Sequence, residues 1–195
     1  MNRKAASPAQ PLPARERILQ TAHDLFYLEG IRATGIDRVI AESGVTKVTL
    51  YRHFPSKNAL ILAFLHYRHE RWMTWFDAAL LRHGARPGHG AAALVPALAE
   101  WFAHPHFRGC AFINAVAEIG PALPEAVECS RRHKRELAER VAALLPESAE
   151  REARAGAIAQ AFDGAIVRAA ADPGAAQSAL DGLALTIEAL SAPDR

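Results

Sequence analysis

Cysteine and long apolar runs are both scarce in this sequence of 195 residues. Its two cysteines, Cys110 and Cys129, are too few for a disulfide framework, so a reducing cytoplasm is the simpler compartment. No run approaches the ~20 consecutive apolar residues that a membrane-spanning helix requires. The N-terminal MNRKAASPAQPLP has two basic residues but no apolar segment after them, which argues against a signal peptide. We therefore expect a cytoplasmic protein with no membrane association.

The motifs of common enzyme classes are missing as well. The sequence contains no HExxH, no CxxC, no Gly-rich phosphate loop and no GxSxG elbow. Among nine histidines, His66 with His69, and His104 with His106 and Cys110, have spacings that a metal site tolerates. These histidines are scattered, and imidazoles near loop ends are usually solvated. We expect no enzymatic activity, no metal and no cofactor.

The charge of the chain is small overall but unevenly distributed. The net charge is +2, while residues 1–57 carry nine Lys and Arg against five Asp and Glu. The remaining residues carry fourteen basic and sixteen acidic side chains. A basic N-terminal part is expected if that part contacts phosphates, although a solvated surface can show the same asymmetry by chance.

The segment GVTKVTLYRHFPSK, residues 44–57, has the outline of a turn followed by a short helix. Gly44 suits the end of a preceding helix with a positive φ, and the Thr46 hydroxyl can cap the next helix. A helix of this length is marginal in water, so packing from behind must hold it. Helix, glycine turn and helix is the order of a helix-turn-helix, whose second helix lies in the DNA major groove.

Residue spacing separates the two sides of this short helix. Leu50 and Phe54 are four residues apart and share one face, whereas Val48 and Arg52 fall nearly opposite at 100° per residue. We expect Leu50 and Phe54 to face the core. Val48 and Arg52 then point outward, where an arginine can donate two hydrogen bonds to guanine, with ~1 to 3 kcal/mol of discrimination.

The run ATGIDRVIAESGVTKVTLYRHFPSKNAL resembles the DNA-binding signature of the tetracycline-repressor (TetR) family of bacterial transcriptional regulators. The resemblance extends from Ala14 to about Ala63, and short motifs such as RGCAFINA and AFDGA continue it along the chain. Two positions depart from the family pattern. Gly35 replaces the usual Ser or Thr, which removes one hydroxyl contact, and Val48 replaces a frequent Gly.

The resemblance implies DNA contacts by side chains on and around the short helix. Thr34 and Lys57 are expected to bind phosphates at neighbouring helix starts. Two copies related by a twofold axis would read a palindromic operator with half-sites about 34 to 36 Å apart, or a multiple of that distance. The expected DNA-binding residues are Thr34, Thr46, Lys47, Val48, Thr49, Tyr51, Arg52, His53 and Lys57.

Hydrophobic periodicity predicts an all-α protein of about nine helices without strands. We expect a disordered arm at residues 1–12, a three-helix helix-turn-helix domain at 13–57, and a ligand-binding and dimerisation domain at 58–195. Beyond the three N-terminal helices, the expected helices span about 56–83, 91–103 with a kink or shortening at Pro96, 107–119, 123–145, 148–170 and 173–190.

Two local features of the N-terminal part carry further expectations. Arg3 and Lys4 in the arm could touch the DNA backbone. Thr34, with Asp37 three residues later, resembles a capping box at the start of the second helix.

For the body, the resemblance implies a regulatory pocket and a homodimer interface. Aromatic residues at helical spacing line such a pocket or form plain core, and two polar residues four apart could orient a small, mostly apolar effector. Small side chains on one helix and an apolar stripe on the next could pair with their copies, or close the protomer's own core. The expected pocket residues are Trp72, Phe76, Trp101, Phe102, Phe112, Asn114 and Glu118, and the expected interface residues are Ala157, Ala161, Gly164, Leu183 and Ile187.

Together these features predict a ligand-responsive repressor that binds its operator as a homodimer. The effector would favour a dimer whose DNA-binding parts are wrongly spaced. The alternative is a redox-sensing regulator, because Arg108 and a helix start near Cys110 could activate its thiol. Against this, the apolar Ala111 and Phe112 that follow favour a buried, inert thiol.

Overall fold

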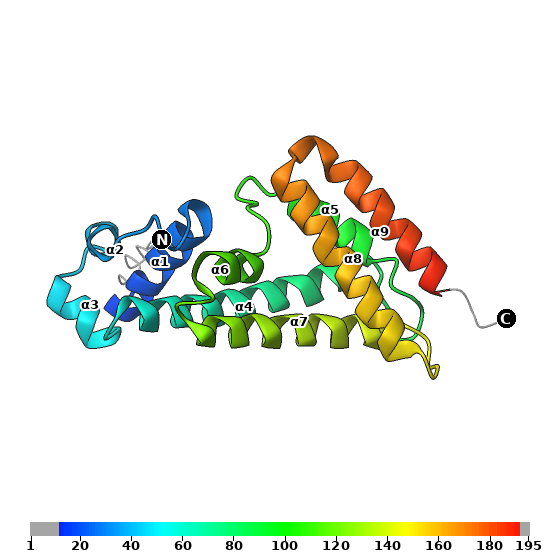
Figure 1. Ribbon diagram of the computed structural model, residues 1–195, viewed down its shortest axis with the longest axis horizontal. Coiled ribbons are helices and arrows are strands. Elements are labelled where there is room, and N and C mark those ends of the chain that lie inside the picture. The colour runs from blue at the N-terminus through cyan, green and yellow to red at the C-terminus, as the bar shows by residue number, and fades with distance from the viewer. Residues whose placement is uncertain (1–11, 192–195) are drawn as a thin grey trace, which may run out of the picture.

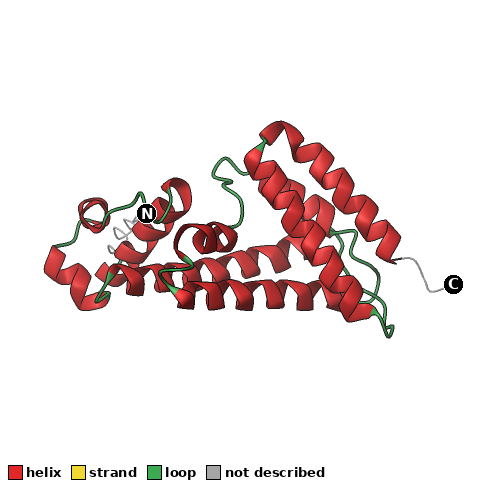
Figure 2. Cartoon of the chain, in the orientation of Figure 1, coloured by secondary structure: helices red, strands yellow, loops and turns green. Residues whose placement is uncertain are grey.

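A computed structural model of the protein describes residues 12–191, which form nine α-helices and one 3-10 turn without strands (Figures 1 and 2). The predicted all-α class and number of helices are confirmed for this part of the chain. The expected arm contacts of Arg3 and Lys4 lie outside the described residues. The elements are α1 Ala14–Glu29, α2 Ile36–Ser43, α3 Lys47–His53, α4 Lys57–Arg82, α5 Leu94–Phe102, α6 Ala111–Ile119, α7 Pro124–Leu144, α8 Arg151–Ala171, η1 Pro173–Ala175 and α9 Ala176–Ser191.

Helices α1 to α3 form a small head at one end of the molecule (Figure 1). Helix α1 packs against both α2 and α3, so the three helices share one core. Ile18, Ala22, Val39 and Leu50 are each fully buried in it. Burial of these apolar side chains holds α3 in place, which its seven residues could not do alone.

The long helix α4 connects the head to the body. Ser56 caps its start, as its hydroxyl accepts a hydrogen bond from the Ala59 backbone N–H at 3.1 Å. Helix α7 lies alongside α4, and the shorter α6 packs against both (Figure 1). Apolar side chains on α4 are buried along nearly its whole length, from Leu60 to Leu80. One continuous helix therefore contributes to the cores of both head and body.

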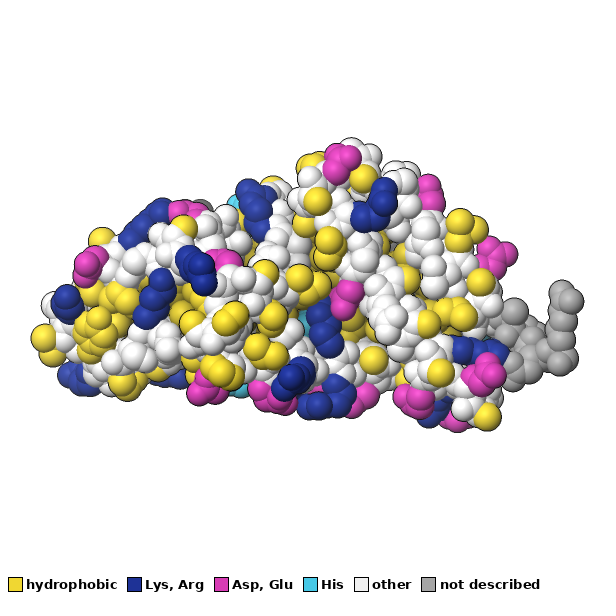
Figure 3. Space-filling model, viewed as in Figure 1, with side chains coloured by type: hydrophobic (Ala, Val, Ile, Leu, Met, Phe, Trp, Pro, Cys, Tyr) yellow, Lys and Arg dark blue, Asp and Glu magenta, His cyan; other side chains and the backbone are white. Residues whose placement is uncertain are grey.

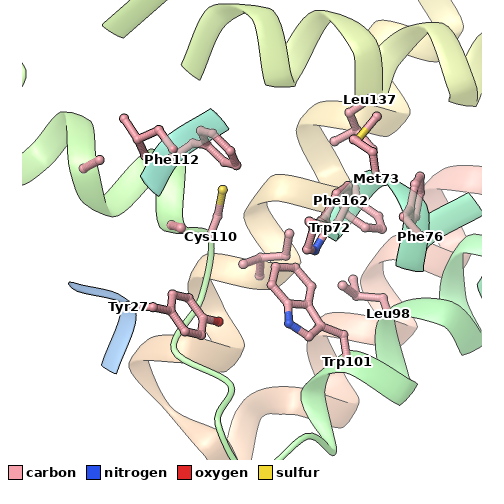
Figure 4. Packing of buried hydrophobic residues seen from close by; sticks show 14 of the residues in the cluster. Tyr27, Trp72, Met73, Phe76, Leu98, Trp101, Cys110, Phe112, Leu137 and Phe162 are labelled. Atoms are coloured by element: carbon pink, nitrogen blue, oxygen red, sulfur yellow. The ribbon is translucent and has the colours of Figure 1, made fainter. Parts of the chain in front are cut away.

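Helices α8 and α9 pack against each other at the far end of the molecule (Figure 1). Phe162 on α8 meets the aromatic residues of α4, and its ring centroid lies 5.7 Å from that of Phe76 (Figure 4). Trp72 stacks on Phe76 at 4.7 Å between centroids, and Trp101 of α5 meets Trp72 edge-on at 5.5 Å. This aromatic cluster joins α4, α5 and α8.

Four helices, α5, α6, α8 and α9, begin three or four residues later than the sequence predicts. Helix α6 starts at Ala111 instead of Phe107, because Gly109 adopts a φ of 76°, which a helix cannot include. Helix α5 starts at Leu94 instead of Ala91, which places Pro96 in its first turn. The N–H that Pro96 lacks would have no helical partner at this position, so of the two expected effects of Pro96, a kink or a shortening, α5 shows the shortening.

Candidate nucleic-acid interface and cavities

The two sides of α3 are separated as the spacing predicts. Leu50 and Phe54 are 0% and 3% exposed, whereas Val48 is 78% exposed and Arg52 is also exposed. Tyr51 extends this outer surface, with 40% of its area exposed. The predicted burial of Leu50 and Phe54 is thus confirmed, and α3 presents an accessible face that no other part of residues 12–191 covers.

The turn before α3 also has the predicted chemistry. Gly44 ends α2 in the left-handed conformation with φ 64°, and Thr46 is the N-cap of α3. The Thr46 hydroxyl oxygen lies 3.2 Å from the Thr49 backbone nitrogen, which donates to it, and 2.9 Å from the Thr49 hydroxyl oxygen. This cap satisfies one of the free N–H groups at the helix start and fixes the angle between α2 and α3.

The remaining polar residues of α3 border the same face. Lys47 is exposed, with its ammonium 4.0 Å from the Asp37 carboxylate, while Thr49 and His53 are half-buried. On the side of the molecule drawn in Figure 3, Lys and Arg side chains lie over the end that carries α1 to α3. An exposed helix face bordered by cations suits a phosphate-rich partner.

The expectation for Thr34 is wrong in two respects. Its side chain is fully buried, and its hydroxyl donates to the Gly30 carbonyl at 2.8 Å instead of facing solvent. Gly35 is the N-cap of α2, and no side chain caps this helix, so there is no capping box with Asp37. Thr34 therefore closes the turn after α1, and its hydroxyl is not available to a phosphate.

Lys57 forms a hydrogen bond to the turn between α1 and α2. Its ammonium donates to the Ile31 carbonyl at 2.7 Å, and partial burial lowers the pKa of Lys57 below its usual value. An ammonium has three N–H donors, so this bond leaves donors free for a phosphate. Lys57 thus joins the start of α4 to the turn between α1 and α2.

Hydrogen bonds join the head to the segment around α6. The phenol of Tyr27 donates to the Gly109 carbonyl at 3.0 Å and accepts from the Arg108 backbone N–H at 3.0 Å. The Glu118 carboxylate accepts from the Arg32 backbone N–H at 2.9 Å. Tyr27 is buried, so its two bonds are shielded from water. No sequence pattern indicated Tyr27, because its partners are about eighty residues away.

A cavity of about 320 Å³ lies at this junction between α1 and α6. Asn114 and Glu118, two of the predicted pocket residues, line it together with Tyr27 and Gly30. Both polar side chains are already engaged, since Asn114 donates to the Arg108 carbonyl at 2.9 Å and Glu118 holds the turn at Arg32. These contacts indicate that Asn114 and Glu118 have a structural role in joining head and body.

A second cavity, of about 420 Å³, lies between α1, α4 and α5. Of the predicted aromatic pocket residues, Trp72 and Trp101 line it, while Phe76, Phe102 and Phe112 line neither cavity. Phe76 is fully buried in the aromatic cluster, and Phe112 stacks on His133 with ring centroids 3.9 Å apart. The residues that line this second cavity are His23, Asp24, Tyr27, Leu28, Arg68, Arg71, Trp72, Trp75, Glu100, Trp101, His104 and His106.

Sequence reasoning missed the charged side of this second cavity. On α4, Arg68 precedes Trp72 by four residues, and Arg71 precedes Trp75 by four residues. The repeat of Arg and Trp at helical spacing was the available signal, because it places both residue types near one another on one helix.

The predicted dimer residues fall into two groups. Leu183 and Ile187 are 1% and 5% exposed in the core of the protomer, so the expectation that they face a second copy is wrong. Their apolar stripe packs α9 against the protomer's own helices. Ala157 and Ala161 are half-buried and Gly164 is exposed, with no heavy atom within 4 Å of the position that a Cβ would take there.

Cys110 is buried at the N-cap of α6. Its sulfur lies 3.4 Å from the ammonium of Lys134, which also binds the Asp163 carboxylate at 2.6 Å. The cation near the thiol is therefore Lys134 and not Arg108, whose guanidinium binds the Phe107 carbonyl at 2.7 Å. Within residues 12–191, no group of three or more His, Cys, Asp or Glu side chains is placed to hold a metal ion.

The described helices also bear on membrane insertion. None of those within residues 12–191 combines the length and the apolar character needed to cross a bilayer.

Comparisons with known proteins agree with the geometry of the head. The family model described as "Bacterial regulatory proteins, tetR family" matches residues 18–64. Among curated proteins, the HTH-type transcriptional regulators YxaF and LmrA of Bacillus subtilis are 49% identical over 43 residues and 50% identical over 42 residues. Each match spans only 22% of this chain and 22% of the relative's length.

The similarity to solved structures extends over the body. SCO4454, a TetR-family transcriptional regulator from Streptomyces coelicolor, is 33% identical, with a TM-score of 0.77 over 92% of this chain and 96% of that chain. A TetR-family regulator from Cytophaga hutchinsonii shares the fold at only 13% identity, with a TM-score of 0.76 over 95% of this chain and 100% of its own.

Proposed function

This chain belongs to the TetR family of transcriptional regulators, and from this premise we propose that it is a ligand-responsive repressor that binds a palindromic operator as a homodimer in the cytoplasm. The observation that carries the proposal is the exposed outer face of α3. Val48 and Arg52 lie on this exposed face, while the buried side chain of Leu50 anchors the helix in the core. A helix held in this way can enter a major groove without loss of its own packing.

Different residues of the head would read bases and bind phosphates. Arg52 is the best candidate for a base contact, because guanidinium can donate two hydrogen bonds to one guanine. Val48 would contact a thymine methyl. Lys47 and Lys57 would bind phosphates, which fix the position of the helix in the groove but do not discriminate sequences. Thr46, Thr49, Tyr51 and His53 complete the surface.

A homodimer would use the accessible faces of α8 and α9. Val167 on α8 and Leu185 on α9 are large apolar residues with 49% and 67% of their area exposed. Exposed glycines, Gly164 on α8 and Gly182 on α9, would let the backbones of two copies approach closely. Ala157 and Ala161 lie on the α8 part of this surface. Two protomers joined here would present two α3 helices to one palindromic operator.

An effector bound in the body would act through the contacts between head and body. Tyr27 belongs both to α1 and to the lining of the two cavities, and its phenol binds the segment before α6. A ligand that binds one arrangement of these contacts better than another shifts the population of dimers toward that arrangement. If the favoured arrangement spaces the two heads wrongly, the repressor leaves its operator.

Selection of genomic DNA fragments tests the proposal directly. Fragments from the source genome that the protein retains should share an inverted repeat, and the Arg52→Ala variant should retain them poorly. Sedimentation of the complex should give two protomers per operator. Retention of DNA without any shared inverted repeat would contradict sequence-specific binding to a palindrome.

A second candidate is regulation through oxidation of Cys110. The observation that favours it is the 3.4 Å contact between the Cys110 sulfur and the Lys134 ammonium, because a cation stabilises a thiolate. Burial of Cys110 limits the access of oxidants and weighs against it. Loss of operator binding after mild peroxide treatment, absent in Cys110→Ser, would favour a redox sensor over a ligand sensor.

A further inference from the structure

Arg68 is a partly buried cation that has no anionic partner within residues 12–191. Its guanidinium carbon lies 3.9 Å from the centroid of the Tyr27 ring, and its Nη1 lies 3.4 Å from Nε2 of His23. None of the ion pairs among the described residues involves Arg68. Removal of a charge from water without a counter-charge is costly, so this site would gain free energy from a bound anion.

His23 supports Arg68 as a neutral acceptor. Burial lowers the pKa of His23 below its ordinary value, despite its hydrogen bond to Asp24. Nδ1 of His23 lies 2.8 Å from the Asp24 carboxylate, to which it can donate, which leaves Nε2 to accept from Arg68. His23 therefore positions the guanidinium without adding a second positive charge.

A second guanidinium borders the same cavity. Arg71 donates to the Tyr67 hydroxyl at 2.8 Å and, like Arg68, takes part in none of the ion pairs of residues 12–191. The two carboxylates in the lining already accept hydrogen bonds. Asp24 binds His23, and Glu100 binds Arg82 at 2.5 Å. Among residues 12–191, Arg68 and Arg71 thus have no ion-pair partner, Glu100 is paired with Arg82, and Asp24 keeps its negative charge because His23 is neutral, so the positive charges of the lining exceed the uncompensated negative one.

Apart from Leu28, the rest of the lining consists of aromatic and histidine rings. Trp72, Trp75 and Trp101 are all the tryptophans in the protein, and their ring centroids lie 5.5 to 6.0 Å apart. The indole N–H of Trp72 is buried and has no hydrogen-bond partner among the described residues. An unsatisfied buried donor is costly, but this nitrogen is closed off from solvent, so a ligand oxygen would reach it only after the indole turned.

We propose that this cavity binds a planar aromatic carboxylate, which acts as the effector. This inference rests on the proposed function and names the chemical class of its ligand. The carboxylate would pair with Arg68 and Arg71, and the ring would pack against the tryptophans. A volume of about 420 Å³ suits a ligand of this kind. The proposal adds a negative charge to the small, mostly apolar effector that the sequence predicts.

The position of this site also explains how a bound ligand would affect the head. Arg68 lies over the ring of Tyr27, whose hydroxyl binds Gly109 and Arg108. A carboxylate that attracts the guanidinium changes the contact that supports this ring. The effector would therefore act on the same tyrosine that joins α1 to the body.

Titration of the full-length protein with naphthalene-2-carboxylate and its neutral isostere naphthalene-2-carboxamide tests the charge requirement. Calorimetry measures affinity, and tryptophan fluorescence reports binding at this cavity, because all three tryptophans line it. We expect the carboxylate to bind about tenfold or more tightly than the carboxamide. Arg68→Met should remove most of this preference and leave carboxamide binding unchanged, since it keeps an apolar side chain of similar length.

Two further variants keep the test decisive. Arg71→Met changes an exposed residue that the fold does not require, and should weaken carboxylate binding by about threefold or more. Arg131→Met is the matched control, because Arg131 is exposed on α7, pairs with Glu128 and lies outside the cavity. The Arg131→Met variant should bind naphthalene-2-carboxylate with the same affinity as the unaltered protein.

The outcomes separate this inference from the proposed function. Equal affinity for both probes, no binding of either, or carboxylate binding that survives Arg68→Met and Arg71→Met would overturn it, even if operator binding is intact. Charge-dependent binding that leaves operator affinity unchanged would uphold the site. That result would instead contradict the ligand-responsive part of the proposed function.

Discussion

The carboxylate of Glu118 on α6 accepts a hydrogen bond from the backbone N–H of Arg32, at 2.9 Å, in the turn that follows α1. Glu118→Ala removes the hydrogen-bond acceptor that residues 12–191 provide for this N–H, so the Arg32 amide should exchange with solvent about tenfold faster. Hydrogen exchange followed by NMR or mass spectrometry measures the change. Glu128→Ala on α7 is the control and should leave Arg32 unaffected. Equal exchange in both variants would show that this bond does not hold the turn.

The two faces of α3 should separate stability from DNA binding. Leu50→Ala empties a fully buried position and should lower the free energy of unfolding by about 2 to 5 kcal/mol. Val48→Ala, on the exposed face, should change it by less than about 0.5 kcal/mol but weaken operator binding. Urea denaturation and operator titration on the same preparations distinguish the two. A large stability loss in Val48→Ala would place this residue in the core.

Arg52 should provide sequence discrimination as well as affinity. Arg52→Ala should reduce affinity for the selected operator by about 1 to 3 kcal/mol and relax the preference at one base pair of each half-site. Lys47→Ala should instead weaken binding to all sequences similarly and reduce the salt dependence. Titration of operator variants at two salt concentrations measures both effects. Uniform loss in Arg52→Ala would reassign it to a phosphate.

Charge placed on the accessible faces of α8 and α9 should dissociate the dimer. Val167→Glu with Leu185→Glu puts like charges on both copies of the surface, so sedimentation should show protomers at concentrations where the unaltered protein is dimeric. The matched control is Leu81→Glu on α4, which changes a side chain that is 76% exposed but lies on another helix. Dimers that persist in the double variant would place the interface elsewhere.

His133 should make stability depend on pH. Burial lowers the pKa of His133 from 6.5 to about 2. Between these values the unfolded chain binds a proton that the folded protein does not, so the free energy of unfolding decreases as pH falls below 6.5. This residue contributes about 1.4 kcal/mol per pH unit, a loss that urea denaturation between about pH 7 and pH 5.5 can detect.

His133→Asn should reduce that pH dependence, because asparagine does not titrate. His89→Asn is the control, since His89 is exposed in the loop before α5 and should leave the dependence unchanged. If the unaltered protein and His133→Asn lose stability equally below pH 6.5, other groups account for the effect.

Local patterns in the sequence were enough to predict the head. Leu50 and Phe54 repeat at helical spacing, and Gly44 with Thr46 marks the turn before them, so neighbours along the chain determine their positions. The hydroxyl of Thr34 could not be placed in this way. Its acceptor, the Gly30 carbonyl, becomes available only where α1 ends and the chain folds back.

Sequence periodicity was less informative in the body. The stripe that contains Leu183 and Ile187 shows that one face of α9 is buried, but it does not say whether the protomer or a second copy covers it. Similarly, Trp72 lines a cavity while Phe76, one turn later, is core, because the difference depends on which helices pack there. Arg68 and Tyr27 meet across 41 positions of the chain, beyond the reach of any local pattern.

Helix α4 contains 26 residues without a break, and its two ends belong to different packing environments. Such a helix is about 39 Å long, so pivoting it by about 5° at the body would displace its head end by about 3 Å. Two heads that swing in opposite directions would change their separation by about twice that amount, a mismatch of about two base-pair steps. A subtle rearrangement around the tryptophans could thus be amplified into release of the operator, with α4 as the lever arm.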